Sequence, residues 1–314
     1  MQPNDRIARA LKLRDLHTFR AVVHHGSMSK AAREIALTPP AITKVIADLE
    51  SLLGVKLLDR TPQGVTPTAY GEALLEGSVS LFDDLQQTVE RIAFLADPTV
   101  GEVRIATADA WMGSLLPVVI DRLSRRYPRI VVHVTVANSF EEHLDALRER
   151  AIDVVMTRLP KDPDDDLDRE VLFDDPPVVV ASRNYPHLHG RNVKLAQLVD
   201  AVWCLPPEGN AISSHLRQVF RLHGLGPPNV AVSCISMQLQ AAMVETGRYL
   251  TVLPNSYMRF RTDATTLKIV PVEVRLNAPP ICIAMLKHRR VNPATKLFIE
   301  TLRMVVKDMK LGKD

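Results

Sequence analysis

A short run of small polar and basic side chains, TPPAITK, begins at Thr38 and leads into a strongly apolar helical pattern. Thr38 suits a helix N-cap, and Pro39 fits the first helical position, where its missing N–H costs no hydrogen bond. Hydroxyl and ammonium groups in the first turns of an exposed helix can bond base edges or phosphates. The residues of this run that could make such contacts with DNA are Thr38, Pro40, Thr43 and Lys44.

Two helices must position this run. The helix after Thr38 is apolar on one face and ends at Gly54, which suits a left-handed C-terminal position; its apolar residues are Ile42, Val45, Ile46, Leu49, Leu52 and Leu53. Ser29 is the expected N-cap of a shorter preceding helix with apolar residues at helical spacing. Two helices joined by a turn of about three to four residues form the helix-turn-helix pattern. Its second helix enters the major groove.

Two further groups are expected to contact the sugar-phosphate backbone. Ser27, Ser29 and Lys30 open the first helix of the pair, whose free N–H groups attract phosphate. For Ser29 and Thr38, capping and a DNA contact are compatible roles. The segment VKLLDRTPQGVTPT then predicts a β-hairpin wing with a turn at Gly64. Arg60 and Thr66 on this wing are expected to reach the backbone, and a solvated hairpin is the alternative.

A long helix without proline is expected over Ala69–Ala96. Apolar residues recur at heptad spacing, which favours a coiled-coil seam with a second copy of the chain. The seam positions are Leu75, Ser78, Phe82, Leu85, Val89, Ile92 and Ala96. Packing of the helix on the rest of the same chain is the alternative. Residues 1–70 hold ten basic and six acidic residues, whereas residues 71–98 hold one basic and six acidic, so the basic charge gathers beside the predicted DNA surface.

Beyond Gly101, short β-rich runs alternate with helical patterns, which predicts an α/β fold with a mostly parallel sheet. About nine runs favour two small sheets rather than one. The expected strands are Val103–Thr107, Ile130–Val136, Asp153–Thr157, Pro177–Ala181, Val202–Leu205, Val230–Ser233, Leu250–Leu253, Leu267–Val270 and Ile281–Leu286. The expected helices are Leu115–Tyr127, Phe140–Arg150, Ile212–His223, Met237–Thr246 and Pro293–Lys310.

Several classes of protein are disfavoured by the sequence. It contains no apolar run of the roughly 18 residues that a membrane span needs and no apolar signal core, so we expect a cytoplasmic protein. The three cysteines are far apart, which predicts buried free thiols: Cys204, Cys234 and Cys282. No dinucleotide-binding, zinc-protease or nucleophile-elbow motif is present, so we expect no cofactor, no metal and no catalytic residues.

These features, in this order, resemble the LysR-type transcriptional regulators, and the resemblance covers essentially the whole chain. It rests on Leu16-His17-Thr18-Phe19, Gly26-Ser27-Met28-Ser29-Lys30-Ala31-Ala32, Pro40-Ala41-Ile42-Thr43, Leu49-Glu50, Leu53-Gly54, Leu57-Leu58-Asp59-Arg60, Thr68 and Gly71. Looser matches follow at Leu115-Leu116-Pro117, Leu147, Ile152-Asp153, Met243-Val244 and Leu253-Pro254. The resemblance implies an N-terminal winged helix-turn-helix, a long linker helix for dimerisation, and a C-terminal α/β effector domain with two lobes like periplasmic binding proteins.

The resemblance also implies boundaries and partners. The expected domains are 1–68 for the winged helix-turn-helix, 69–97 for the linker helix, 98–100 for a hinge, and 101–314 for the effector-binding domain. Within the last, lobe one is 101–173 with 279–314, and lobe two is 174–278. The expected partners are double-stranded promoter DNA, a small-molecule effector between the lobes, and further copies of the chain in a homodimer that assembles to a homotetramer.

Residues that follow the carboxyl ends of strands, next to helix N-termini, are the expected effector contacts. They are Thr107, Asp109, Ala110, Trp111, Asn138, Ser139, Arg158, Pro206, Asn210 and Ser236. Packing is the alternative for Trp111, and helix capping is the alternative for Ser139. The Asp109 carboxylate would repel an anionic effector unless Arg158 offsets it, so a cationic, amide or neutral polar ligand stays open.

Two other functions remain open at this point. A solute-binding or enzymatic two-lobed protein would account for residues 101–314 and leave the first hundred residues as an accessory head. A constitutive DNA-binding architectural protein would account for the head and leave the lobes without a ligand.

Overall fold

The computed structural model of this 314-residue chain describes residues 10–62, 64–136, 139–159, 164–186, 192–260, 266–273 and 276–310. It divides into two compact units, residues 1–89 and 90–314. Among the described residues, none of the helices is both long enough and apolar enough to cross a membrane. The boundary between the units falls within the long helix α5 (Ala69–Ala96).

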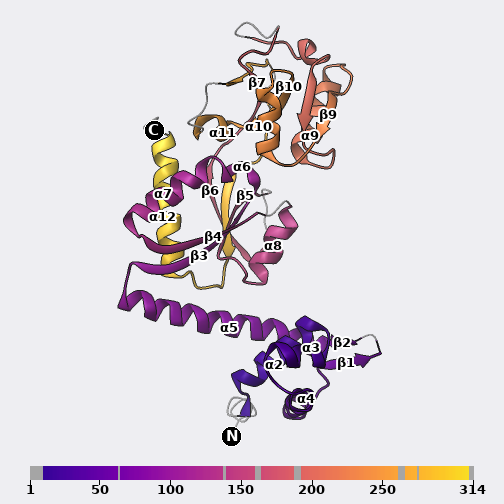
Figure 1. Cartoon of the computed structure of the whole chain (residues 1–314), viewed down its shortest axis with the longest axis vertical. Helices are drawn as coiled ribbons and strands as arrows, with labels where there is room; N and C mark the ends of the chain where they lie inside the picture. The colour runs from indigo at the N-terminus through magenta and orange to yellow at the C-terminus, as the bar shows by residue number, and fades with distance from the viewer. Residues whose placement is uncertain are drawn as a thin grey trace. The chain divides into compact units, whose positions relative to one another are not determined.

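The N-terminal unit contains a helical head and a hairpin (Figure 1). Its elements are α2 (Leu13–His25), α3 (Met28–Glu34), α4 (Pro39–Leu53), β1 (Leu58–Thr61), β2 (Gly64–Pro67) and α5 (Ala69–Ala96). Phe19, Ile42 and Ile46 are fully buried in the core that α2, α3 and α4 share. The helix-turn-helix, the hairpin and the long helix predicted from the sequence are therefore confirmed.

The hairpin tip lies against the turn between α2 and α3. The backbone N–H of Val65 donates to the carbonyl of Gly26 at 2.9 Å. Gly64 has φ of +145°, and a Cβ at this position would lie 2.7 Å from the same carbonyl oxygen. Only glycine therefore fits here without a shift of the backbone, and the wing is held at one angle to the helices.

The first lobe of the C-terminal unit is one mixed sheet, ordered β4-β3-β5-β12-β6, between two layers of helices. Its strands are β3 (Val100–Thr107), β4 (Arg129–Val136), β5 (Val154–Arg158), β6 (Leu167–Phe173) and β12 (Ile281–Leu286). Its helices are α6 (Asp109–Met112), α7 (Leu115–Arg126), α8 (Phe140–Arg148) and α12 (Pro293–Lys310). Ile281 and Ile283 of β12 pack in the core that includes α7 and α12, whereas Cys282 and Ala284 pack with the apolar residues of α8. In Figure 1 α8 lies on one side of this sheet, and α7 and α12 lie on the other.

The second lobe is also a mixed sheet, ordered β11-β7-β10-β8-β9. Its strands are β7 (Pro177–Ser182), β8 (Val202–Leu205), β9 (Asn229–Ser233), β10 (Tyr249–Pro254) and β11 (Leu267–Ile269). Its helices are the 3-10 turn η1 (Leu195–Leu198), α9 (Ala211–Leu222), α10 (Met237–Glu245) and α11 (Asn255–Phe260). The α9 helix and η1 pack on the face that carries Trp203, and α10 packs on the face that carries Val180.

The expectation of a mostly parallel sheet is wrong. In lobe one β3 pairs in parallel with β4 and β5, but β12 runs antiparallel to both β5 and β6. In lobe two β8 pairs in parallel with β9 and β10, but β7 runs antiparallel to β10 and β11. The reason is topological. The chain leaves lobe one after β6 and returns to it at β12. β12 therefore does not reach its neighbours through a strand–helix–strand crossover, the connection that makes neighbouring strands parallel.

One of the three cysteines, Cys234 in lobe two, also differs from the expectation. Cys204 and Cys282 are buried free thiols as predicted, but Cys234 is half-buried. The reason is that Cys204 lies within the buried strand β8, whereas Cys234 lies in the loop after β9.

Candidate functional site

The first turns of α4 present the predicted polar run to solvent. Thr38 is the N-cap, and its hydroxyl accepts from the backbone N–H of Ala41 at 3.4 Å. Thr43 and Lys44 are exposed, whereas Ile42 and Ile46 on the opposite face have no exposed surface. Pro40 is also exposed in the first turn. The helix therefore turns its apolar face to the head core and its small polar face to solvent.

The cap of α3 differs from the prediction. Ser27, not Ser29, is the N-cap, and its hydroxyl accepts from the backbone N–H of Lys30 at 3.4 Å. The chain leaves α2 through Gly26 in the left-handed region, and Ser27 then takes an extended conformation, so the helix begins two residues earlier than expected. Ser29 lies in the first turn of α3, where it is exposed beside Lys30.

The wing presents Arg60 and Thr66 in different directions. Arg60 is paired with Val65 across the hairpin, and Thr66 is paired with Asp59. Directly opposed residues share one face of a hairpin, so Arg60 and Thr66 lie on opposite faces. Both side chains are exposed, so each face of the wing presents one of them to solvent.

Glu50 joins the end of α4 to the wing. Its carboxylate accepts from the backbone N–H of Leu57 at 2.9 Å and of Leu58 at 3.4 Å, and it pairs with Lys56 at 2.7 Å. Burial raises the pKa of Glu50, but the hydrogen bonds from Lys56 and the two backbone N–H groups outweigh it and hold that pKa below its ordinary value. The ionised carboxylate thus fixes the wing relative to α4.

In the C-terminal unit, Trp111 and Arg158 meet at one buried carboxylate, that of Asp175. The indole N–H of Trp111 donates to Asp175 at 3.1 Å, and the Arg158 guanidinium lies over the Trp111 ring. The backbone N–H and the hydroxyl of Ser256 donate to the same carboxylate at 2.8 and 2.7 Å. Because Trp111 lies in α6 of lobe one and Ser256 in α11 of lobe two, Asp175 links the two lobes.

Arg158 binds both segments that connect the lobes. Its guanidinium donates to the carbonyl of Asp175 at 2.6 Å, on the segment between β6 and β7, and to the carbonyl of Pro279 at 2.5 Å, just before β12. Burial lowers the pKa of this guanidinium, and the Asp175 carboxylate opposes that effect. The Arg158 guanidinium is therefore hydrogen-bonded to both of the segments that connect the lobes.

Asp109 and Ser236 meet at the start of α10. The Asp109 carboxylate accepts from the backbone N–H of Met237 at 2.7 Å, and Ser236 caps the helix by accepting from Leu239 at 3.3 Å. Asp109 belongs to lobe one and α10 to lobe two. This is a second direct bond between the lobes.

The other residues predicted to bind the effector have local roles. Thr107 is fully buried and donates to the carbonyl of Met156 at 3.0 Å, between β3 and β5. Ala110 packs in the core of lobe one. Ser139 caps α8 and Asn210 caps α9, while the carbonyl of Pro206 accepts from Ser213. Asn138 lies outside the described residues.

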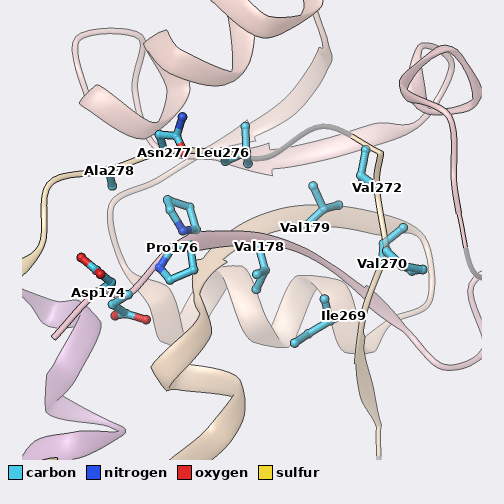
Figure 2. Close-up of a pocket in the computed structure, with 13 residues that line it drawn as sticks. Asp174, Pro176, Val178, Val179, Ile269, Val270, Val272, Leu276, Asn277 and Ala278 are labelled. Atoms are coloured by element: carbon cyan, nitrogen blue, oxygen red, sulfur yellow. The ribbon is translucent and has the colours of Figure 1, made fainter. Parts of the chain in front are cut away.

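A cavity of about 530 Å³ adjoins the two connecting segments on the lobe-two side. It is lined by residues 174–179, 269–272 and 276–278. Asp174 and Ala278 lie toward one end, and Val270 and Val272 lie toward the other (Figure 2). None of the effector residues predicted from the sequence lines it. Its volume is in the range of small-molecule sites.

Sequence reasoning missed Asp175 and Ser256 as site residues. The expected lobe boundary falls at residue 174, but no pattern around Asp174-Asp175 assigns either residue a role in the site. The three donors that converge on Asp175 come from positions 111, 158 and 256, and no local pattern connects them.

Comparison with known proteins agrees with this architecture. Residues 13–72 match the family described as bacterial regulatory helix-turn-helix protein, lysR family, and residues 96–307 match the LysR substrate binding domain. The HTH-type transcriptional regulator GbpR of Azospirillum brasilense is 30% identical over 93% of this chain and 86% of its own length. BenM of Acinetobacter baylyi is 26% identical over 94% of this chain and 96% of its own.

Solved structures show the same fold. Full-length CbnR in complex with its target DNA superposes with a TM-score of 0.60 at 23% identity, covering 94% of this chain and 100% of that one. A full-length variant of OxyR from Pseudomonas aeruginosa gives a TM-score of 0.64 at 21% identity and covers 95% of each chain. With both family descriptions matched in order over most of its length, this chain belongs to the LysR family of helix-turn-helix transcriptional regulators.

Proposed function

We propose that the head binds promoter DNA through the first turns of α4, in one major groove per head. The observation that carries the proposal is the exposure of Thr43 and Lys44 in the second turn of α4, with Ile42 and Ile46 buried behind them. Thr38 and Pro40 lie at the cap and in the first turn of the same helix, and Ser27, Ser29 and Lys30 offer a phosphate contact at the start of α3. Arg60 and Thr66 supply backbone contacts from the two faces of the wing.

An electrophoretic shift assay on the promoter beside the gene tests this surface. Thr43→Ala and Lys44→Ala are expected to weaken binding about tenfold or more, the usual cost of one lost base or phosphate contact. Ser51→Ala, an exposed change at the far end of α4, is the matched control. Wild-type binding should fall steeply with salt. Unchanged affinity in both α4 variants would contradict the assignment.

We also propose that α5 forms a homodimer seam and that dimers pair into a homotetramer. Leu85, Val89 and Ile92 keep the predicted heptad spacing and are exposed to solvent. The first two predicted seam positions are not free for a partner helix: Leu75 packs against the core of the head, and Ser78 is buried. An apolar stripe of this length is unstable in water, so a second α5 is its proposed cover.

Sedimentation of the full chain checks this assembly. Val89→Glu with Ile92→Glu is expected to shift the protein toward the monomer, because each carboxylate would be buried without a partner. Thr88→Glu, one position outside the seam and also exposed, should leave the assembly unchanged. Equal masses for all variants and the wild type would count against the seam.

In this proposal the domains keep the expected boundaries: 1–68 binds DNA, 69–97 links and dimerises, 98–100 is a hinge, and 101–314 binds a small molecule and acts in the cytoplasm without catalysis. The effector lies between lobe one (101–173 and 279–314) and lobe two (174–278). Two bonds across the lobes support this position, at Asp109 and at Asp175. A ligand that prefers one lobe angle would shift the spacing of the DNA heads.

A metabolite screen by thermal shift tests the effector site. A ligand that binds only the folded protein raises its melting temperature, and the same ligand should change the DNA affinity. A solute-binding or enzymatic role would instead give ligand binding or turnover with no change in DNA affinity. A constitutive architectural role would give no ligand at all.

A further inference from the structure

The bond between Asp109 and Met237 places a carboxylate of lobe one at the start of a helix of lobe two. The 2.7 Å separation between the carboxylate oxygen and the Met237 nitrogen is that of a charge-assisted hydrogen bond. Met237 is the first residue of α10, which continues to Glu245. The contact therefore joins the free N–H end of a helix to a negative charge.

Such a helix end is where an anionic ligand would bind. The first N–H groups of a helix lack partners within it, and the helix dipole favours a negative charge there. Ser236 satisfies only the N–H of Leu239. Asp109 satisfies that of Met237, so the position next to the helix start is already taken by a carboxylate of the chain itself.

A second observation bears on the charge of this site. Arg158 is the only cation among the residues predicted to bind the effector, and its guanidinium is engaged with the carbonyls of Asp175 and Pro279. It also lies 3.7 Å from the Asp175 carboxylate. A free carboxylate that entered beside Asp109 would thus meet a like charge. The Arg158 guanidinium is bound to Asp175 and Pro279, and the structure records no ion pair between it and Asp109 among the described residues.

We propose that Asp109 is an internal anion that holds the lobes together at α10, and that the interlobe site of this chain therefore excludes carboxylate effectors. The site then takes a neutral or cationic molecule that donates hydrogen bonds toward Asp109. This inference rests on the interlobe effector site proposed above and names the chemical class of ligand that fits it. Removal of the Asp109 side chain opens the helix start to a free carboxylate.

Chemical rescue with acetate tests the proposal. Thermal melts of the full chain are compared in sodium acetate and in sodium chloride at equal ionic strength. The wild type is expected to melt at the same temperature in both salts. Asp109→Ala should melt at a lower temperature in chloride, and acetate should raise its melting temperature in a saturable way. Asp121→Ala, which removes an exposed carboxylate on α7, is the matched control and should show no acetate effect.

Amide hydrogen exchange gives a readout that does not depend on the alanine variant. In Asp109→Asn, which keeps the size of the side chain, the Met237 amide should exchange faster than in the wild type, because a neutral acceptor binds it less strongly. Unchanged exchange at Met237 would overturn the proposal. So would an acetate effect that is equal in the wild type and Asp109→Ala, or no greater in Asp109→Ala than in Asp121→Ala.

These outcomes are distinct from a failure of the proposed function. If a neutral metabolite stabilises the wild type, the interlobe effector site is supported even when acetate does not rescue Asp109→Ala. Loss of DNA binding in the α4 variants concerns only the head. A carboxylate metabolite that stabilises the wild type, and does so equally in Asp109→Asn, would refute the role of Asp109 and retain the effector site.

Discussion

The sulfur atoms of Cys204 and Cys234 lie 3.8 Å apart, although the two residues belong to the end of β8 and to the loop after β9. Cys234 is two residues before Ser236, which caps α10. The pair therefore lies beside the helix whose first N–H binds Asp109.

Thiol reactivity should divide the three cysteines. Burial and the neighbouring Cys234 raise the pKa of Cys204 to about 12, and burial also raises the pKa of Cys282. We expect Cys234 to react first with a thiol reagent in the native protein. We further expect diamide to remove one hydrogen from each thiol of the pair and to form a Cys204–Cys234 disulfide, since modest rotations bring the sulfurs to the bonded distance of about 2.05 Å. Peptide mapping by mass spectrometry checks this. A disulfide that involves Cys282 would contradict it.

Asp175→Ala should strongly destabilise the effector unit. It removes the acceptor of Trp111 and Ser256 and leaves the buried guanidinium of Arg158 without its carboxylate. Breaking one partner of a buried pair costs about 3–5 kcal/mol. The adjacent Asp174→Ala is the matched control, because Asp174 is exposed, and it should change stability by about 0.5 kcal/mol or less. Chemical unfolding followed by near-ultraviolet circular dichroism distinguishes the two variants.

His143 should make the protein less stable in mild acid. Burial lowers the pKa of this imidazole on α8, although Ser139 and Glu142 oppose the effect, so the folded state resists a proton that the unfolded state accepts. Stability is then full above the unfolded pKa of about 6.5 and falls below it, by at most about 1.4 kcal/mol per pH unit. His143→Leu should flatten this dependence in melts between pH 7 and pH 5. Equal slopes in wild type and variant would show that other groups control it.

Glu50→Ala should loosen the wing without unfolding α4. The change leaves the backbone N–H groups of Leu57 and Leu58 without their carboxylate, at a cost of about 1–3 kcal/mol. Because the pKa of Glu50 is lowered in the folded head from its ordinary value of 4.5, the stabilisation from this contact is full above that value. It is lost as the pH falls through the lower folded pKa. Hydrogen exchange of residues 57–67 in the full chain measures the effect. Asp48→Ala, an exposed change on the same helix, serves as its control.

The elements that carry a strong local pattern could be predicted from the sequence. The strands Val202–Leu205 and Ile281–Leu286 and the helix Pro293–Lys310 have the expected bounds, because each is a periodic or uniformly apolar run. β6, with the sequence LDREVLF, was missed because charged residues interrupt its apolar positions. The helix α6 is four residues long, too short for a helical period to appear.

The bonds of the interlobe site could not be predicted in the same way. Asp109 and Met237 are joined across 128 positions, and Trp111 and Asp175 across 64. Asp109 and Met237 each begin a helix, Trp111 is a buried ring, and Asp175 lies on the segment between β6 and β7. These contacts depend on how the two lobes pack against each other, and the lobes are joined by two segments that are distant in the sequence. The choice of Ser27 over Ser29 as a cap likewise follows from the conformation of Gly26, which residue type alone does not fix.

The place of β12 in the first sheet has a consequence for how the protein is made. This strand lies between β5 and β6, yet the ribosome synthesises it more than a hundred residues after both. Until it emerges, the nascent chain carries β5 with one open edge and β6 without a neighbour, while the intervening lobe is continuous and can fold first. Unpaired strand edges favour aggregation. Synthesis that stops before Ile281 would therefore leave a chain with one finished lobe and one incomplete, aggregation-prone lobe.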